Sequence, residues 1–229
     1  MKLQRILLIA AAVISFLTPP LRSQQRFDHI VRNDFFAGFS GNNEALERAM
    51  KVSADTIAQE PNHAEALVWH GAGLFFQSGQ YFRKGDQAKG MELYGQGIAE
   101  MKKGVELKPK SVGVRIPRGS VLLTASRSMP PQLAAPLRAD GIADYLTVYE
   151  MQKDRLSELG THPSGELLFN LADAYSRQGD VENAQRFFDL ITKTLPDTVY
   201  SKRAAIWNET KQPLPLAQAT CAGCHNANK

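Results

Sequence analysis

The stretch GELLFNLADAYSRQGDVENAQRFFDLITKTLPDT, residues 165–198, decides the fold expected for this chain. Its apolar residues recur at steps of three and four, which is the spacing of one face of an α-helix. Gly179 and Asp180 interrupt this pattern near its middle, and Pro196 ends it. We therefore expect two antiparallel helices joined by a tight turn.

The residue types in this stretch resemble, position by position, the 34-residue tetratricopeptide (TPR) repeat. Large, small and aromatic side chains stand in the order of that repeat: Leu168, Leu171, Ala172, Tyr175, Ala184, Phe188, Ile191 and Pro196. The small residue Ala184 falls where the two helices would cross, because small side chains let helix backbones approach. The resemblance implies an all-α fold, a right-handed stack of antiparallel helix hairpins.

Other parts of the chain match the repeat less strictly. Residues 64–111 resemble a divergent copy, 48 residues long, with about fourteen inserted around residues 81–95 that longer helices would absorb. Residues 43–61 resemble the second helix of an earlier repeat, and residues 27–39 its degraded first helix. Residues 112–159 are helical in period without matching the repeat. The predicted TPR-like domain covers residues 24–210.

Several glycines are expected to end or weaken the helices of this region. Ser78–Gly79 is among the breakers expected to end a helix. Gly85, Gly90, Gly95 and Gly97 are expected to weaken the helix of the inserted region by up to ~1 kcal/mol each. Trp69, His70, Phe75 and Phe76 cluster on one expected helix, where a ligand groove is one interpretation. The favoured interpretation is that Leu67, Leu74 and Phe75 are core and that His70 is a hydrogen-bonded polar neighbour.

The N-terminus has the order of a secretory signal peptide. Lys2 and Arg5 precede an apolar run of twelve residues, 6–17, and Pro19–Pro20 follows. Such a run spans only about 18 Å as a helix, which is short of a bilayer core of about 30 Å. We expect residues 1–23 to be removed and the protein to be periplasmic or secreted, an uncleaved membrane anchor being the alternative.

Composition excludes several classes of function. Residues 1–23 hold three basic side chains and no acidic one, which leaves 24 basic against 23 acidic side chains in the remainder. Nucleic-acid binding is therefore not expected. Two cysteines are too few for a multi-disulfide scaffold. Sequence motifs of hydrolases, P-loop proteins, zinc proteases and dinucleotide-binding enzymes are missing, so we predict no catalytic residue and no enzyme activity.

Both cysteines belong to Cys221-Ala222-Gly223-Cys224-His225, in a tail, residues 211–229, that contains Pro213 and Pro215. This pattern is the C-x-x-C-H attachment motif of c-type cytochromes. The resemblance implies one haem c, bound covalently to Cys221 and Cys224, with His225 as the proximal iron ligand. A Cys221–Cys224 disulfide, a zinc site and an unused motif are the alternatives.

The position of the motif limits the resemblance to the motif itself. Four residues follow it, so no class I cytochrome domain is expected, and the tail is not the helix of class II cytochromes. The sixth iron ligand stays open among nine side chains: His29, His63, His70, His162, Met50, Met91, Met101, Met129 and Met151. A five-coordinate haem without a sixth ligand is the equal alternative.

Three functions follow as hypotheses. The first is an exported TPR-like scaffold with one covalent haem, acting in electron transfer or as a haem-bearing accessory subunit. Its protein or redox partner would bind the concave helical surface, and it would contact membrane only through an uncleaved signal segment. The second is a haem-free scaffold for a protein or peptide, with Cys221 and Cys224 in a disulfide; a periplasmic binder of small ligands is a weaker third.

Overall fold

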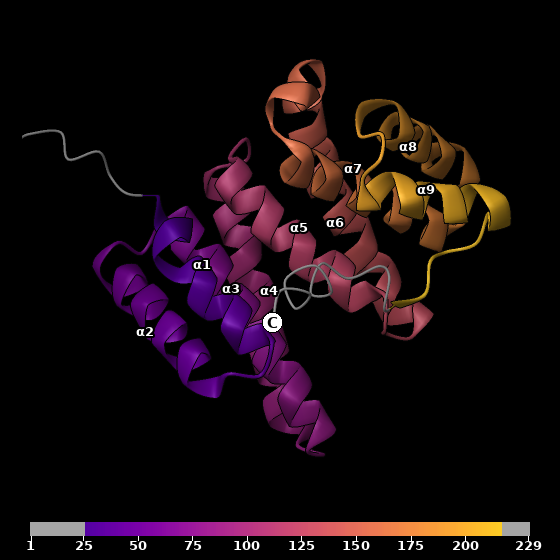
Figure 1. The fold of residues 1–229 in the computed structure, drawn as a ribbon. Coiled ribbons are helices and arrows are strands. Elements are labelled where there is room, and N and C mark those ends of the chain that lie inside the picture. The colour runs from indigo at the N-terminus through magenta and orange to yellow at the C-terminus, as the bar shows by residue number, and fades with distance from the viewer. Residues whose placement is uncertain (1–25, 217–229) are drawn as a thin grey trace, which may run out of the picture.

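Four helix hairpins and one further helix build most of the described chain. The computed structural model describes residues 26–216, and these contain nine α-helices and no strand (Figure 1). The helices are α1 (Phe27–Phe39), α2 (Asn43–Gln59), α3 (Ala64–Arg83), α4 (Gln87–Leu107), α5 (Val112–Ser126), α6 (Pro131–Gln152), α7 (Thr161–Gln178), α8 (Val181–Thr194) and α9 (Val199–Thr210), with a 3-10 helix, η1 (Lys153–Glu158), after α6.

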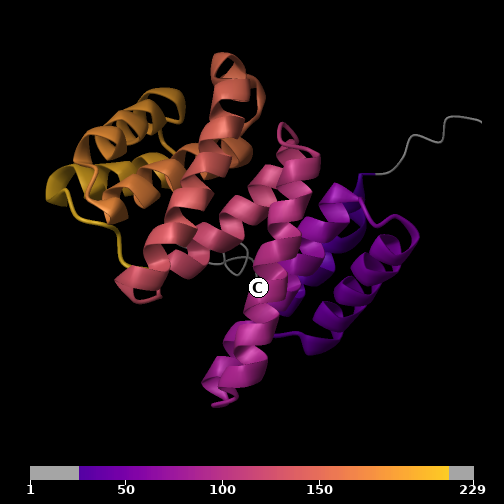
Figure 2. The same ribbon diagram turned by 180° about the vertical axis from the view of Figure 1, so that it is seen from behind.

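The hairpins α1–α2, α3–α4, α5–α6 and α7–α8 are stacked in chain order, and α9 packs on α8 (Figures 1 and 2). The predicted all-α stack of helix hairpins is confirmed. Residues 112–159, for which the sequence predicted helices without the repeat, form α5, α6 and η1. The calls on residues 1–23 lie outside the described residues.

Polar side chains begin the second helix of three hairpins. Asn42, Asp86 and Asp180 accept hydrogen bonds from the backbone amides of Ala45, Lys89 and Asn183 at 3.1, 3.0 and 3.0 Å. These bonds satisfy amides that have no partner within the helix. The glycine before each aspartate, Gly85 or Gly179, has a positive φ of 84° or 83°. The α3–α4 and α7–α8 hairpins therefore share one turn chemistry.

The predicted helix end at Ser78–Gly79 is wrong. Helix α3 continues to Arg83, and the chain turns at Gly85 instead. The Ser78 hydroxyl donates to the Phe75 carbonyl at 2.6 Å, so its polar group is satisfied inside the helix. The predicted insertion is accommodated by α3 and α4, which have 20 and 21 residues.

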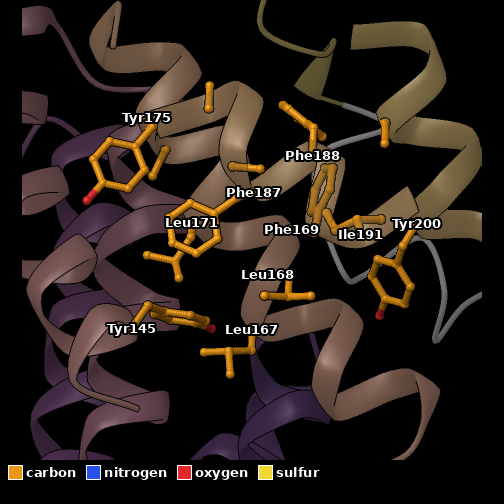
Figure 3. Packing of buried hydrophobic residues seen from close by; sticks show 14 of the residues in the cluster. Tyr145, Leu167, Leu168, Phe169, Leu171, Tyr175, Phe187, Phe188, Ile191 and Tyr200 are labelled. Carbon is orange, nitrogen blue, oxygen red and sulfur yellow. The ribbon is translucent and has the colours of Figure 1, made fainter. Parts of the chain in front are cut away.

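Large side chains fill the core of α7, α8 and α9 (Figure 3). Phe188 stacks on Trp207 with ring centroids 4.6 Å apart, and the Trp207 indole donates to the Ser176 hydroxyl at 2.7 Å. Ala184 is fully buried in the same cluster, as its predicted place at a helix crossing requires. This end of the molecule is a packed apolar core.

Backbone contacts join α3 and α4. A Cβ added at Gly97 would lie 2.6 Å from the Gly71 carbonyl oxygen, and one added at Gly71 would lie 2.7 Å from the Gly97 carbonyl oxygen. One added at Gly104 would lie 2.7 Å from the carbonyl oxygen of Ala64. The two helices are close enough that only hydrogen atoms fit between them at these points.

Candidate functional site

The haem-attachment residues Cys221, Cys224 and His225 lie outside the described residues, but the start of their tail is described. Leu214 is buried against the core cluster that contains Trp207. Its carbonyl oxygen accepts a hydrogen bond from Arg177 Nη2 at 2.5 Å. The tail is therefore held against the end of α7 before the motif begins.

The histidines considered as sixth ligand have structural partners. His63 Nδ1 accepts a hydrogen bond from the Ala66 amide at 3.1 Å, and His70 Nδ1 lies 2.6 Å from Glu100. His162 Nδ1 lies 3.3 Å from the Tyr200 hydroxyl. His29 Nε2 lies 3.9 Å from the Asp28 carboxylate. Within the described part of the chain, no three His, Cys, Asp or Glu side chains are grouped to hold a metal ion.

The aromatic group on α3 is core, as interpreted from the sequence. Trp69 and Phe75 are buried, and Trp69 stacks on Phe35 with ring centroids 5.2 Å apart. Phe76 is half-buried and packs against Phe39, with ring centroids 4.9 Å apart. Trp69 and Phe76 therefore join α3 to α1, whereas Phe75 packs against Tyr94 of α4.

The methionines considered as sixth ligand differ in their surroundings. Met101 is in the core, and Met50 packs among the residues that join α1, α2 and α3. Met91 and Met151 are exposed on α4 and α6. Met129 is half-buried in the turn between α5 and α6, where it lines a pocket together with Pro213 of the tail. Met129 is thus the candidate next to the described start of the tail.

This pocket, which we call the arginine pocket, has a volume of about 260 Å³. It lies between the end of α5, the first turns of α6, the end of α7 and the tail. Its wall is made by Ser126, Arg127, Met129, Pro131, Ala134, Arg138, Arg177 and Pro213.

Two of the three arginines share one carboxylate. Arg127 Nε and Arg177 Nε each donate to Asp173 Oδ2 at 2.9 Å. Asp173 is 1% exposed, and Arg127 Nη2 also donates to the side-chain oxygen of Asn170 at 2.9 Å. Buried charges of this kind are stable only when they are paired and hydrogen-bonded. Asp173 therefore fixes the position of both guanidinium groups.

Arg138 binds backbone only. Its Nη1 donates to the Arg177 carbonyl at 3.2 Å and its Nη2 to the Ser126 carbonyl at 3.3 Å. Its Nε is buried and has no hydrogen-bond partner in the described part of the chain. Burial, and then the charge of Arg177, lower the pKa of Arg138 from its ordinary value, while Asp173 opposes this effect. The pocket thus holds three guanidinium groups near one carboxylate, and it is suited to an anion.

The sequence indicated this site at one place only. Asp173 and Arg177 are four residues apart, which is the spacing of an ion pair on one face of a helix. Arg127 and Arg138 come from other helices, and their approach to α7 depends on the packing of the hairpins.

No protein-family model, no curated protein and no solved structure matches this chain. Among the described helices, none has the length and apolar character needed to span a membrane.

Proposed function

We propose that this protein is an exported TPR-like scaffold that carries one covalently attached c-type haem. Cys221 and Cys224 would hold the haem through thioether bonds, and His225 would bind its iron. The Cys-Ala-Gly-Cys-His motif carries this proposal, because it accounts for both thiols of the chain and for the histidine that follows them. The bound haem would supply one-electron transfer.

The described residues fit such a group. Haem carries carboxylates as well as an iron atom that accepts thioether ligands, and the arginine pocket offers guanidinium groups and the sulfur of Met129. Pro213 belongs to the wall of this pocket and to the tail that leads to the motif. The hairpin stack and the burial of Ala184 support the TPR-like part of the proposal.

In this proposal the helical stack has a supporting role. It would hold the haem-bearing tail against α7 and offer its surface to a redox or structural partner. Either electron transfer or an accessory role in a larger complex follows from this arrangement. We propose no catalytic residue.

The experiment is to produce the full-length chain in a bacterium able to attach haem in its periplasm and to measure the intact mass. We expect loss of about the first two dozen residues and a gain of one haem that survives acid extraction. Cys221→Ala with Cys224→Ala should abolish the attachment. His225→Ala should change the absorption spectrum, whereas the control Arg155→Gln, which alters an exposed side chain on η1, should not.

Two outcomes would contradict the proposal. A colourless protein with Cys221 and Cys224 in a disulfide would favour the haem-free scaffold for a protein or peptide partner. A mature mass that still includes Met1 would favour an uncleaved membrane anchor over export of the free protein.

A further inference from the structure

The arginine pocket carries positive charge that the described side chains do not neutralise. Arg127 and Arg177 share Asp173, and Arg138 has no carboxylate partner in the described residues. Arg138 Nε and Asp173 Oδ1 are both enclosed by the protein without a hydrogen-bond partner in the described residues, so neither atom reports on a ligand. The unbalanced group is the Arg138 guanidinium as a whole, because its two terminal nitrogens bind only backbone carbonyls. An anion bound in the pocket would balance its charge.

We propose that the arginine pocket is a carboxylate-binding site, and that it takes the propionate groups of the haem carried on the tail. This inference rests on the proposed function. A guanidinium group presents parallel N–H donors that match the two oxygens of a carboxylate. Arg138 is the residue without a carboxylate partner among the described residues, and each of its terminal nitrogens donates one hydrogen bond to backbone. Arg127 and Arg177 add positive charge from fixed positions.

The connection between the pocket and the motif is short. Pro213 lines the pocket, and Leu214 is fixed by its burial and by Arg177. Cys221 follows Leu216 by five residues, which cover at most about 17 Å. The length of the chain therefore allows a haem attached at Cys221 and Cys224 to reach this pocket.

A carboxylate could also come from a free small acid, and the test separates the two sources. The full mature chain with Cys221→Ser and Cys224→Ser, which prevents covalent attachment, is titrated with iron(III) protoporphyrin IX and with its dimethyl ester. The two probes differ at their propionates, which are charged carboxylates in the acid and neutral methyl esters in the other probe. We expect the free acid to bind at least about tenfold more tightly, which is the usual effect of a charged hydrogen bond.

Arg138→Gln should remove this preference, because it deletes the charge and keeps a side chain that can donate to a backbone carbonyl. Arg138→Lys should retain most of it. The control is Arg155→Gln, which deletes one exposed charge on η1, beyond the other end of α6 and about 30 Å from the pocket along that helix. This control should bind both probes as the parent chain does.

Equal binding of the acid and the ester by the parent chain would overturn the inference without any variant. Succinate is the third probe. If it binds equally well to the haem-loaded protein and to the haem-free chain, the pocket takes a free acid and the propionate assignment is wrong. If the preference for the acid is found but the native protein gains no covalent haem, the carboxylate site stands and the proposed function fails.

Discussion

Two hairpins of this molecule have the same turn but differ in how closely their helix backbones approach each other. Gly85–Asp86 and Gly179–Asp180 turn the chain in the same way, with the aspartate at the start of the second helix. Between α7 and α8 the space is filled by aromatic and aliphatic side chains. Between α3 and α4, glycines bring the two backbones into contact at residues 71, 97 and 104. Side chains such as Phe75 and Tyr94 pack elsewhere between these helices. The turn therefore determines that a hairpin forms, and the residues of its interior determine how close the helices come.

This difference predicts opposite responses to mutation. A core of large side chains is destabilised chiefly by removing volume, which leaves a cavity. A contact between two backbones is destabilised by adding volume, since the neighbouring atoms cannot move aside without shifting a helix. The predictions below test this contrast in order of decreasing effect.

Trp207→Ala should produce the largest loss, about 3–5 kcal/mol of unfolding free energy. Trp207 is fully buried, stacks on Phe188 and donates to Ser176. Urea denaturation followed by circular dichroism measures the loss. The control is Ile206→Ala on the same helix, whose side chain is 41% exposed, with an expected change within about 0.5 kcal/mol. Equal losses in the two variants would contradict the assignment of Trp207 to the core.

Ala184→Leu should destabilise the α7–α8 hairpin by about 1–3 kcal/mol. Ala184 is fully buried, so the added carbon atoms would force neighbouring side chains from their positions. The midpoint of thermal unfolding measures this effect. An unchanged midpoint would show that the helix crossing has room at this position, contrary to the packing described here.

Gly97→Ala and Gly95→Ala should have opposite signs although each adds one methyl group. The methyl group at residue 97 would lie 2.6 Å from the Gly71 carbonyl oxygen. The methyl group at residue 95 would have no atom of a neighbouring element within 4 Å. We expect Gly97→Ala to cost about 1–2 kcal/mol net and Gly95→Ala to stabilise by about 0.5–1 kcal/mol. Denaturation midpoints of the two variants, compared with the parent chain, test this. If both substitutions stabilise the protein, the backbone contact between α3 and α4 at Gly97 is not as close as described.

Asp180→Ala and Asp86→Ala should each cost about 1 kcal/mol near pH 7, because each removes a helix-capping carboxylate. Hydrogen bonds from Asn183 lower the pKa of Asp180 below its ordinary value. A folded-state pKa below the unfolded one gives stability that is present above the unfolded pKa and is lost as the pH falls below about 4. The effect of Asp180→Ala should therefore shrink in acid. Asp180→Asn, which keeps a capping oxygen, should remain close to the parent chain near pH 7.

The helices and most of their boundaries were predictable because both depend on local sequence. A period of three and four residues and the Gly179–Asp180 turn need no knowledge of the rest of the chain. The role of Gly97 was not predictable in this way. In isolation a glycine weakens a helix, as it does at Gly95, and only the presence of Gly71 on another helix makes it a packing residue.

The candidate site likewise has one part that depends on local sequence and one part that depends on long-range packing. The Cys221–His225 motif is local in sequence, and its attachment of haem stays a prediction. The arginine pocket was missed because its charges converge from the α5–α6 turn, α6 and α7. Arg127 and Asp173 are 46 residues apart in the chain, and only the stacking of hairpins brings them within 2.9 Å. Long-range contacts of this kind leave no period in the sequence.

The burial of Leu214 separates the folding of this chain from the supply of its proposed cofactor. Leu214 is the last residue of the described core clusters, and Cys221 comes seven residues later. All residues of the described apolar core therefore precede the motif in the chain. We expect the helical stack to fold whether or not haem is attached to the tail.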